Sequence, residues 1–217
     1  METIAIVGGT GPLGRGLAAR WTRAGLPVVI GSRNAQKAED AVARLVDEGA
    51  PADRVSGGDN VAAVRAADVV ILAVPYAAQE ATLTALADEV GQRVLCTAVV
   101  PLGFDGDGPH LLEVEDGSAA AECRRVLPDA RLVAGFHAVS SKRLRKVDEP
   151  VEADALLCGD DEEALDVIAR LADAVPGLRG VVVGPLRLAG QLEGQTAIVL
   201  SYNQRAGTEA GLRLVES

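Results

Sequence analysis

The chain repeats one pattern, in which short runs of Val, Ile and Leu are separated by longer Ala-rich stretches. The short runs lack strict alternation with polar residues, which is typical of strands buried on both faces. We therefore predict strands at Thr3–Val7, Pro27–Gly31, Asp68–Val74, Arg93–Ala98, Arg131–Phe136, Ala155–Cys158 and Gly180–Val183, with a weaker one at Arg54–Ser56. Between them we predict helices at Gly11–Ala24, Ala35–Glu48, Asn60–Ala66, Ala77–Glu89, Ala119–Val126, Asp161–Ala174 and Leu186–Ala206. This order predicts an α/β fold with a Rossmann-type, doubly wound, mainly parallel sheet.

Two segments depart from this pattern. Leu102–Ser118 is rich in Gly and Asp, and we expect a long surface loop there, a candidate lid. The composition becomes more acidic after about residue 148. We therefore divide the chain into a Rossmann domain at residues 1–147 and a small α/β C-terminal extension at residues 148–217, which would complete a cleft.

A glycine-rich loop, Gly8-Gly9-Thr10-Gly11-Pro12-Leu13-Gly14, links the first predicted strand to the first predicted helix. Gly9, Gly11 and Gly14 fit the GxGxxG pattern of dinucleotide sites, in which a tight turn and a helix start surround a pyrophosphate. The free N–H groups and positive dipole of the helix start attract that anion. The alternative is a tight strand–helix turn without a ligand, but the position of the motif between strand and helix favours a binding site.

The end of the second predicted strand indicates which dinucleotide binds. An NAD site usually has an Asp or Glu there to bind the ribose 2′-hydroxyl. This chain instead has Ser32 and Arg33, with Lys37 one helical turn further on. A hydroxyl, a guanidinium and an ammonium group suit a 2′-phosphate, so the sequence predicts NADP(H). The alternative, ordinary surface charges, is disfavoured because cations are unfavourable near a helix start.

Composition and charge exclude several classes of protein. The net charge of −10 argues against nucleic-acid binding, which needs a basic face. No apolar run approaches the roughly 20 residues of a membrane helix, and the first predicted strand begins too early to leave room for a signal peptide. Cys96, Cys123 and Cys158 are odd in number and widely spaced, so we expect reduced core residues and a cytoplasmic protein.

The candidate chemistry at the carboxyl edge of the sheet is sparse. Val74-Pro75-Tyr76 and Val99-Val100-Pro101 end two predicted strands at this edge, where doubly wound folds bind ligands. His137 ends another, and it either lines a substrate pocket or is a hydrogen-bonded strand-end histidine. We find no Tyr-xxx-Lys pair, no GxSxG elbow and no metal-ligand spacing in the sequence. Hydride transfer between two planar carriers needs none of these groups, only juxtaposed rings in a dry crevice.

One basic patch, Ser140-Ser141-Lys142-Arg143-Leu144-Arg145-Lys146, stands out in this acidic chain. It is either a solvated helix face or an anchor for the anionic tail of a second ligand.

These residues together resemble the NADPH-dependent F420 reductases, also called F420H2:NADP oxidoreductases, along nearly the full length of the chain. The resemblance rests on the glycine loop, Gly31-Ser32-Arg33 with Lys37, Val74-Pro75-Tyr76, the region of Phe136-His137, Cys158-Gly159-Asp160-Asp161, Gly184-Pro185-Leu186 and the tail Asn203–Leu214. It implies an oxidoreductase, usually a homodimer, that passes a hydride between NADP(H) and the deazaflavin coenzyme F420 as co-substrate. From the residues that are missing, described above, we expect no catalytic acid or base and no bound metal.

The resemblance further implies roles for individual residues. Gly9, Thr10, Gly11, Pro12 and Leu13 would bind pyrophosphate and ribose, and Ser32, Arg33 and Lys37 the 2′-phosphate. Thr10 and Val139 would flank the nicotinamide, and the rest of the cleft would be lined by Val74, Pro75, Tyr76, Val100, Pro101, His137 and Ser141. Lys142, Arg143 or Arg187 would meet the anionic tail of F420.

The sequence departs from the family in Ala138-Val139-Ser140-Ser141 and in Arg187-Leu188-Ala189, both on the second ligand's side. The alternatives are another NADPH-dependent reductase, with an imine, flavin or metal-chelate acceptor, and a non-catalytic NADP(H) sensor.

Overall fold

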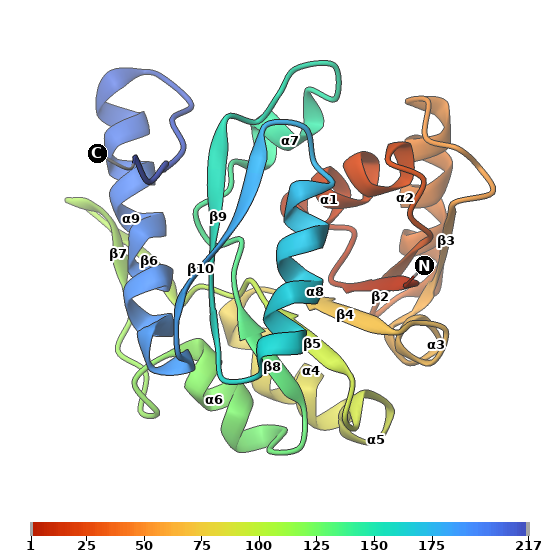
Figure 1. Cartoon of the computed structure of the whole chain (residues 1–217), viewed down its shortest axis with the longest axis horizontal. Coiled ribbons are helices and arrows are strands. Elements are labelled where there is room, and N and C mark those ends of the chain that lie inside the picture. Colours follow the sequence, from red (N-terminus) through yellow and green to blue (C-terminus); the bar gives the residue numbers. More distant parts are fainter. Residues whose placement is uncertain (1, 216–217) are drawn as a thin grey trace.

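A computed structural model of the chain, describing residues 2–215, has one large sheet with helices on both faces (Figure 1). Eight strands form this sheet, in the order β10-β9-β8-β5-β4-β1-β2-β3. Their bounds are β1 Ile4–Val7, β2 Val28–Ser32, β3 Val55–Asp59, β4 Val69–Leu72, β5 Val94–Thr97, β8 Arg131–Ala134, β9 Ala153–Gly159 and β10 Leu178–Gly184. All eight predicted strands are therefore present, and the order of β3, β2, β1, β4 and β5 is that of a Rossmann fold.

Strand direction changes once across the sheet. Neighbouring strands are parallel from β3 to β8, whereas β8 and β9 pair antiparallel through Val133 with Gly159 and Ala134 with Cys158. β10 is parallel to β9. Because β9 and β10 extend the same sheet, the C-terminal segment continues the Rossmann core.

The helices agree with the prediction except in three places. Their bounds are α1 Pro12–Arg23, α2 Ala35–Asp47, α3 Asn60–Arg65, α4 Gln79–Ala85, α5 Ala87–Val90, α6 Ala119–Val126, α7 Ser141–Arg145, α8 Glu162–Asp173 and α9 Ala189–Ala206, with 3₁₀ turns η1 Tyr76–Ala78 and η2 Leu186–Leu188. The single helix predicted at Ala77–Glu89 is wrong, since Leu86 leaves helical geometry (φ −111°, ψ 5°) and is buried in the core. The helix predicted from Leu186 begins with a 3₁₀ turn, and the basic patch forms the short helix α7.

The prediction of an irregular loop at Leu102–Ser118 is also wrong in its first part. Strands β6 Leu102–Asp105 and β7 Gly108–Leu111 form an antiparallel hairpin there, and β7 packs against α9 (Figure 1). Leu102 and Leu112 donate their N–H groups to the carbonyls of Val100 and Pro101, so the hairpin starts and ends at the carboxyl edge of β5.

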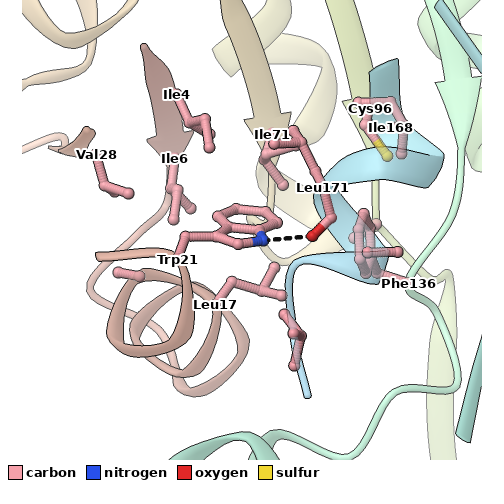
Figure 2. Close-up of a cluster of buried hydrophobic side chains, with 14 of the residues drawn as sticks. Ile4, Ile6, Leu17, Trp21, Val28, Ile71, Cys96, Phe136, Ile168 and Leu171 are labelled. Atoms are coloured by element: carbon pink, nitrogen blue, oxygen red, sulfur yellow. Dashed lines mark hydrogen bonds between the residues drawn. The ribbon is translucent and has the colours of Figure 1, made fainter. Parts of the chain in front are cut away.

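Two hydrophobic cores lie on opposite faces of the sheet. One contains α1, α2 and α8, and the other contains α3 to α6 and the start of α9. At the centre of the first core, the Trp21 indole N–H donates to the Leu171 carbonyl at 2.7 Å, and the ring packs edge-on against Phe136 (Figure 2). Cys96, Cys123 and Cys158 are free thiols buried in these cores, as predicted.

Candidate functional site

The glycine loop is shaped by close contacts between main-chain atoms. Gly8, one residue before the GxGxxG motif, is the residue with left-handed geometry (φ +78°), where a Cβ would lie 2.7 Å from the Ala73 carbonyl oxygen. A Cβ on Gly14 would lie 2.6 Å from the Gly9 Cα, so only glycine lets α1 start this close to β1. The tight turn of the loop therefore depends on Gly8 as well as on the three glycines of the motif.

The start of α1 is free to receive an anion. Its N-cap residue, Gly11, makes no side-chain hydrogen bond, whereas the helices after β2 and β3 are capped by Asn34 and Asp59. The first N–H groups of a helix have no partner within it and carry the positive end of its dipole. An uncapped start at a glycine loop therefore suits a pyrophosphate.

A cavity of about 290 Å³ lies above this loop, and we call it the loop cavity. Its wall combines residues of the loop, of the β2 end and of the β4 end: Gly8, Thr10, Gly11, Ser32, Arg33, Asn34, Lys37, Asn60, Ala73, Val74, Pro75, Ala78 and Thr82. Within residues 2–215, no hydrogen bond or ion pair engages the side chain of Arg33 or Lys37. The two cations are thus available to an anionic ligand.

Ser32 is fixed in the wall of the loop cavity. It is 7% exposed, and its Oγ accepts the N–H of Asn34 at 3.2 Å while keeping its own proton to donate. Asn60, which sequence reasoning missed, contributes a buried amide oxygen without a partner among residues 2–215. Its position directly after β3, at the carboxyl edge of the sheet, is the signal that could have identified it.

A second cavity, of about 530 Å³, continues from the loop cavity and shares with it Ser32, Arg33, Asn60, Ala78 and Thr82. We call it the alanine cavity because Ala77, Ala78, Ala81 and Ala85 form much of its wall. Small apolar side chains on one side leave room for a flat ring. The two cavities together can hold an extended dinucleotide, with phosphate groups near Arg33.

A third cavity, of about 520 Å³, lies on the other side of the glycine loop, and we call it the C-terminal cavity. Its wall joins three distant segments: Pro12 and Leu13, then His137–Lys142, and finally Thr196, Val199, Leu200, Asn203, Gln204, Thr208 and Glu209 of α9 and the following tail. The predicted residues that meet here are Pro12, Leu13, His137, Val139, Ser141 and Lys142. Sequence reasoning did not assign the α9 residues to the cleft, because they are far along the chain from the glycine loop.

His137 has unusual surroundings in the C-terminal cavity. It is 8% exposed, and neither ring nitrogen has a hydrogen-bond partner within residues 2–215. Burial lowers the pKa of His137 to about 4, so the ring is neutral at pH 7. A neutral imidazole carries one N–H donor and one acceptor, and in the described part of the chain both are buried without a partner.

The backbone before His137 is strained. Phe136 has a positive φ of 63°, which is rare for a bulky residue, and its ring is held in the core against Trp21. On the other side, the Thr196 hydroxyl of α9 donates to the His137 carbonyl at 2.9 Å. These contacts fix the main chain on both sides of the His137 ring.

Four of the residues predicted to bind the coenzymes, Gly9, Tyr76, Val100 and Pro101, lie outside the walls of these three cavities. The Tyr76 hydroxyl turns to α6 and donates to Glu122 Oε2 at 2.9 Å, and burial raises the pKa of Tyr76 to about 12. Val100 and Pro101 begin the β6–β7 hairpin. Gly9 lies buried beneath the loop, where its N–H donates to the carbonyls of Ile6 and Gly31.

Two further properties of the described part of the chain concern metals and membranes. No group of three or more His, Cys, Asp or Glu residues within residues 2–215 is placed to hold a metal ion. No helix in the same range combines the length and hydrophobicity needed to cross a bilayer.

Comparison with known proteins identifies the family. Residues 3–101 match the family model described as NADP oxidoreductase coenzyme F420-dependent. The chain is 38% identical to the F420-dependent NADP reductase of Methanothermobacter thermautotrophicus, over 97% of this chain and 94% of that protein. It is 37% identical to the F420-dependent NADP reductase of Methanocaldococcus jannaschii, over 92% of each.

Solved structures support the fold. A crystal structure from Arthrobacter sp. FB24 superposes with a TM-score of 0.82 over 100% of both chains, at 21% identity. An imine reductase from Bacillus cereus superposes with a TM-score of 0.64 over 94% of this chain and 62% of that one, at 18% identity. The fold is thus shared more widely than the sequence, and it is the sequence identity over nearly the whole length that decides the family. The chain belongs to the family of F420-dependent NADP reductases.

Proposed function

We propose that this protein transfers a hydride between NADP(H), bound in the loop and alanine cavities, and the deazaflavin coenzyme F420, bound in the C-terminal cavity. One observation carries this proposal: the glycine loop belongs to the walls of both sites. Thr10 and Gly11 face the loop cavity, while Pro12 and Leu13 face the C-terminal cavity. Two ligands bound against neighbouring residues of one short loop can bring their reactive rings together.

The residues of the loop cavity fit NADP(H). The uncapped start of α1 would hold the pyrophosphate. Arg33 and Lys37, whose side chains pair with no residue in the described part of the chain, would bind the 2′-phosphate together with the Ser32 hydroxyl. Val74 and Pro75 close the opposite wall, where they would exclude water from the nicotinamide end.

The residues of the C-terminal cavity fit a planar second carrier. Val139, Val199 and Leu200 provide apolar surface, and the neutral His137 ring completes this wall without adding a charge. Hydride donor and acceptor carbons are supplied by the two bound coenzymes. The chain's own contribution is to orient both rings and to exclude water between them, without a catalytic acid or base.

The test of this function is turnover of both coenzymes by the purified protein. Mixing the protein with NADPH and oxidised F420 is expected to bleach the deazaflavin absorbance, and NADPH oxidation is expected to follow at the same rate. Bound NADPH without any bleaching would contradict the proposal. Oxidation of NADPH only by an imine, a flavin or a metal chelate would favour the alternative reductase, and complex formation without turnover on any acceptor would favour a sensor.

A cavity-filling variant assigns the second site. Leu200→Trp puts a bulky ring into the C-terminal cavity, so we expect F420 turnover to fall while the Kd for NADPH stays within about twofold. Asp166→Trp, on the exposed face of α8, is the matched control. Equal effects of both variants would contradict the placement of F420.

We further propose that the protein is a cytoplasmic homodimer. We also propose that residues 148–217 form an extension of the Rossmann domain at residues 1–147. The exposed apolar side chains of Phe104 on the hairpin and of Ile198 and Tyr202 on α9 support a self-contact on this side. Buried free thiols are in keeping with a reducing compartment. Light scattering after size exclusion tests the dimer, and a mass of one chain would contradict it.

A further inference from the structure

Arg20 of α1 has a buried guanidinium, and its hydrogen bonds within residues 2–215 all go to one segment of the chain. The residue is 2% exposed. Its three side-chain nitrogens donate at 2.6–3.0 Å to main-chain carbonyls of Arg143, Leu144, Lys146, Val147 and Glu149. This segment contains the end of α7 and the turn that follows it.

The contact with Arg20 stabilises α7, which is too short to be stable by itself. Five residues are too few for a helix to persist without tertiary support, and its last carbonyls have no partners within it. A cation is favourable at this negative end of a helix. Because burying a guanidinium is costly unless its donors are satisfied, the carbonyls and Arg20 depend on each other.

A second contact brings α7 close to α1. Leu144 is fully buried against Gly16, where an added Cβ would lie 2.7 Å from the Leu144 Cβ. Arg20 and Gly16 are one helical turn apart on α1, so both act on the same face of that helix. The two helices therefore pack closely against each other at Gly16 and Leu144.

This packing determines one wall of the C-terminal cavity. Ser141 and Lys142 of α7 line the cavity, and Pro12 and Leu13 line it from the first turn of α1. Arg143 extends the wall, since its Nε donates to the Glu209 carbonyl of the tail. A shift of α7 would therefore displace two cavity residues and loosen the tail that closes the cavity.

We propose that Arg20 is a positioning residue for the second substrate: its guanidinium fixes α7 to the glycine-loop helix and so sets the width of the C-terminal cavity. The role rests on the proposed function, because it takes the C-terminal cavity as the F420 site. Arg20 lies at the far end of α1 from the glycine loop and outside the walls of the loop and alanine cavities, so NADP(H) binding does not depend on it.

Arg20→Lys tests this role, because a single ammonium group cannot reach five carbonyls in different directions. We expect the KM for F420 to rise roughly tenfold or more, since a displacement of about 1 Å is enough for that. The Kd for NADPH is expected to stay within about twofold. Arg23→Lys is the matched control, on the same helix but bonded to the Ala19 and Glu48 carbonyls.

Two additional measurements make the test decisive. Hydrogen exchange is expected to accelerate at the amides of residues 143–147 in Arg20→Lys and to stay unchanged in Arg23→Lys. Gly16→Ala adds a Cβ that pushes Leu144, and with it α7, away from α1, so it is also expected to raise the KM for F420. This variant is used in place of Arg20→Lys if Arg20→Lys does not fold.

The outcomes separate the two proposals. Unchanged exchange at residues 143–147, or equal losses for F420 and NADPH, would overturn the role of Arg20. A wild-type protein without F420 turnover would overturn the proposed function, and with it the substrate part of this role.

Discussion

Arg33→Ala is the substitution that tests the choice of dinucleotide most directly. Arg33 lies in the wall of the loop cavity, and no described residue pairs with its guanidinium. Removing it costs the fold little, because an exposed side chain without partners contributes little to stability. Any loss of binding therefore reports on the ligand and not on the fold.

The size of the effect follows from the exposure of the site. A hydrogen bond to a charged group contributes about 1.5–3 kcal/mol, and an exposed one lies near the lower end. A loss of about 1.5–2 kcal/mol weakens NADPH binding roughly ten- to thirtyfold. NADH lacks the 2′-phosphate, so its Kd is expected to change by less than about twofold.

Lys37→Ala and the double variant extend the measurement to a cycle. Lys37 is a point charge one helical turn from Arg33, so we expect a smaller loss, of about threefold to fivefold. Because both cations would contact one phosphate, the two losses are expected to be non-additive. Raising the salt concentration should weaken NADPH binding more in the wild type than in the double variant.

Calorimetric titration of each variant with NADPH and with NADH provides the data. Arg44→Ala is the matched control, because Arg44 is also exposed on α2 but lies in its last turn. Equal losses for NADPH and NADH, or an effect of Arg44→Ala as large as that of Arg33→Ala, would refute the assignment of the 2′-phosphate site.

Three further predictions concern the loop, the core and the cavity. Gly14→Ala places a Cβ 2.6 Å from the Gly9 Cα, so we expect the free energy of unfolding to fall by about 1–3 kcal/mol and NADPH to bind more weakly. Chemical denaturation and NADPH titration measure the two effects, and a variant with wild-type affinity would contradict the close approach. Trp21→Phe removes the donor to the Leu171 carbonyl at the end of α8, and an expected loss of about 2–4 kcal/mol should lower Tm by several degrees in calorimetry. The pKa of His137 is about 4 in the folded chain and about 6.5 when unfolded, so between these pH values the unfolded state binds the proton and the folded state does not. The resulting stability, of about 3 kcal/mol, is fully present above pH 6.5 and is lost as the pH falls through 4. Urea unfolding between pH 7 and 4 should therefore show a smaller acid-induced loss in His137→Leu than in the wild type, and identical pH profiles would refute the burial of a neutral ring.

The sequence by itself determined the dinucleotide half of the protein. The glycine loop, the β2 end at Ser32 and Lys37 lie within one βαβ unit of 37 residues, where strand, turn and helix signals are local. Parallel strands bring their carboxyl ends to one edge of the sheet, so the meeting of the loop with Ser32, Arg33 and Val74 followed from the order of the elements. All eight strands of the large sheet were predicted for the same reason.

Only the tertiary structure decided the second half of the site. Strands buried on both faces carry no signal for direction, so the antiparallel pairing of β8 with β9 was not predictable from their sequences. The C-terminal cavity joins residues 12–13, 137–142 and 196–209, and contacts over such separations depend on how helices pack and not on any local pattern. Tertiary packing also decides two hydrogen bonds, from Arg20 to α7 and from Tyr76 to Glu122. A side chain can bond only to a group that the fold places within its reach, so neither partner could be predicted from the sequence.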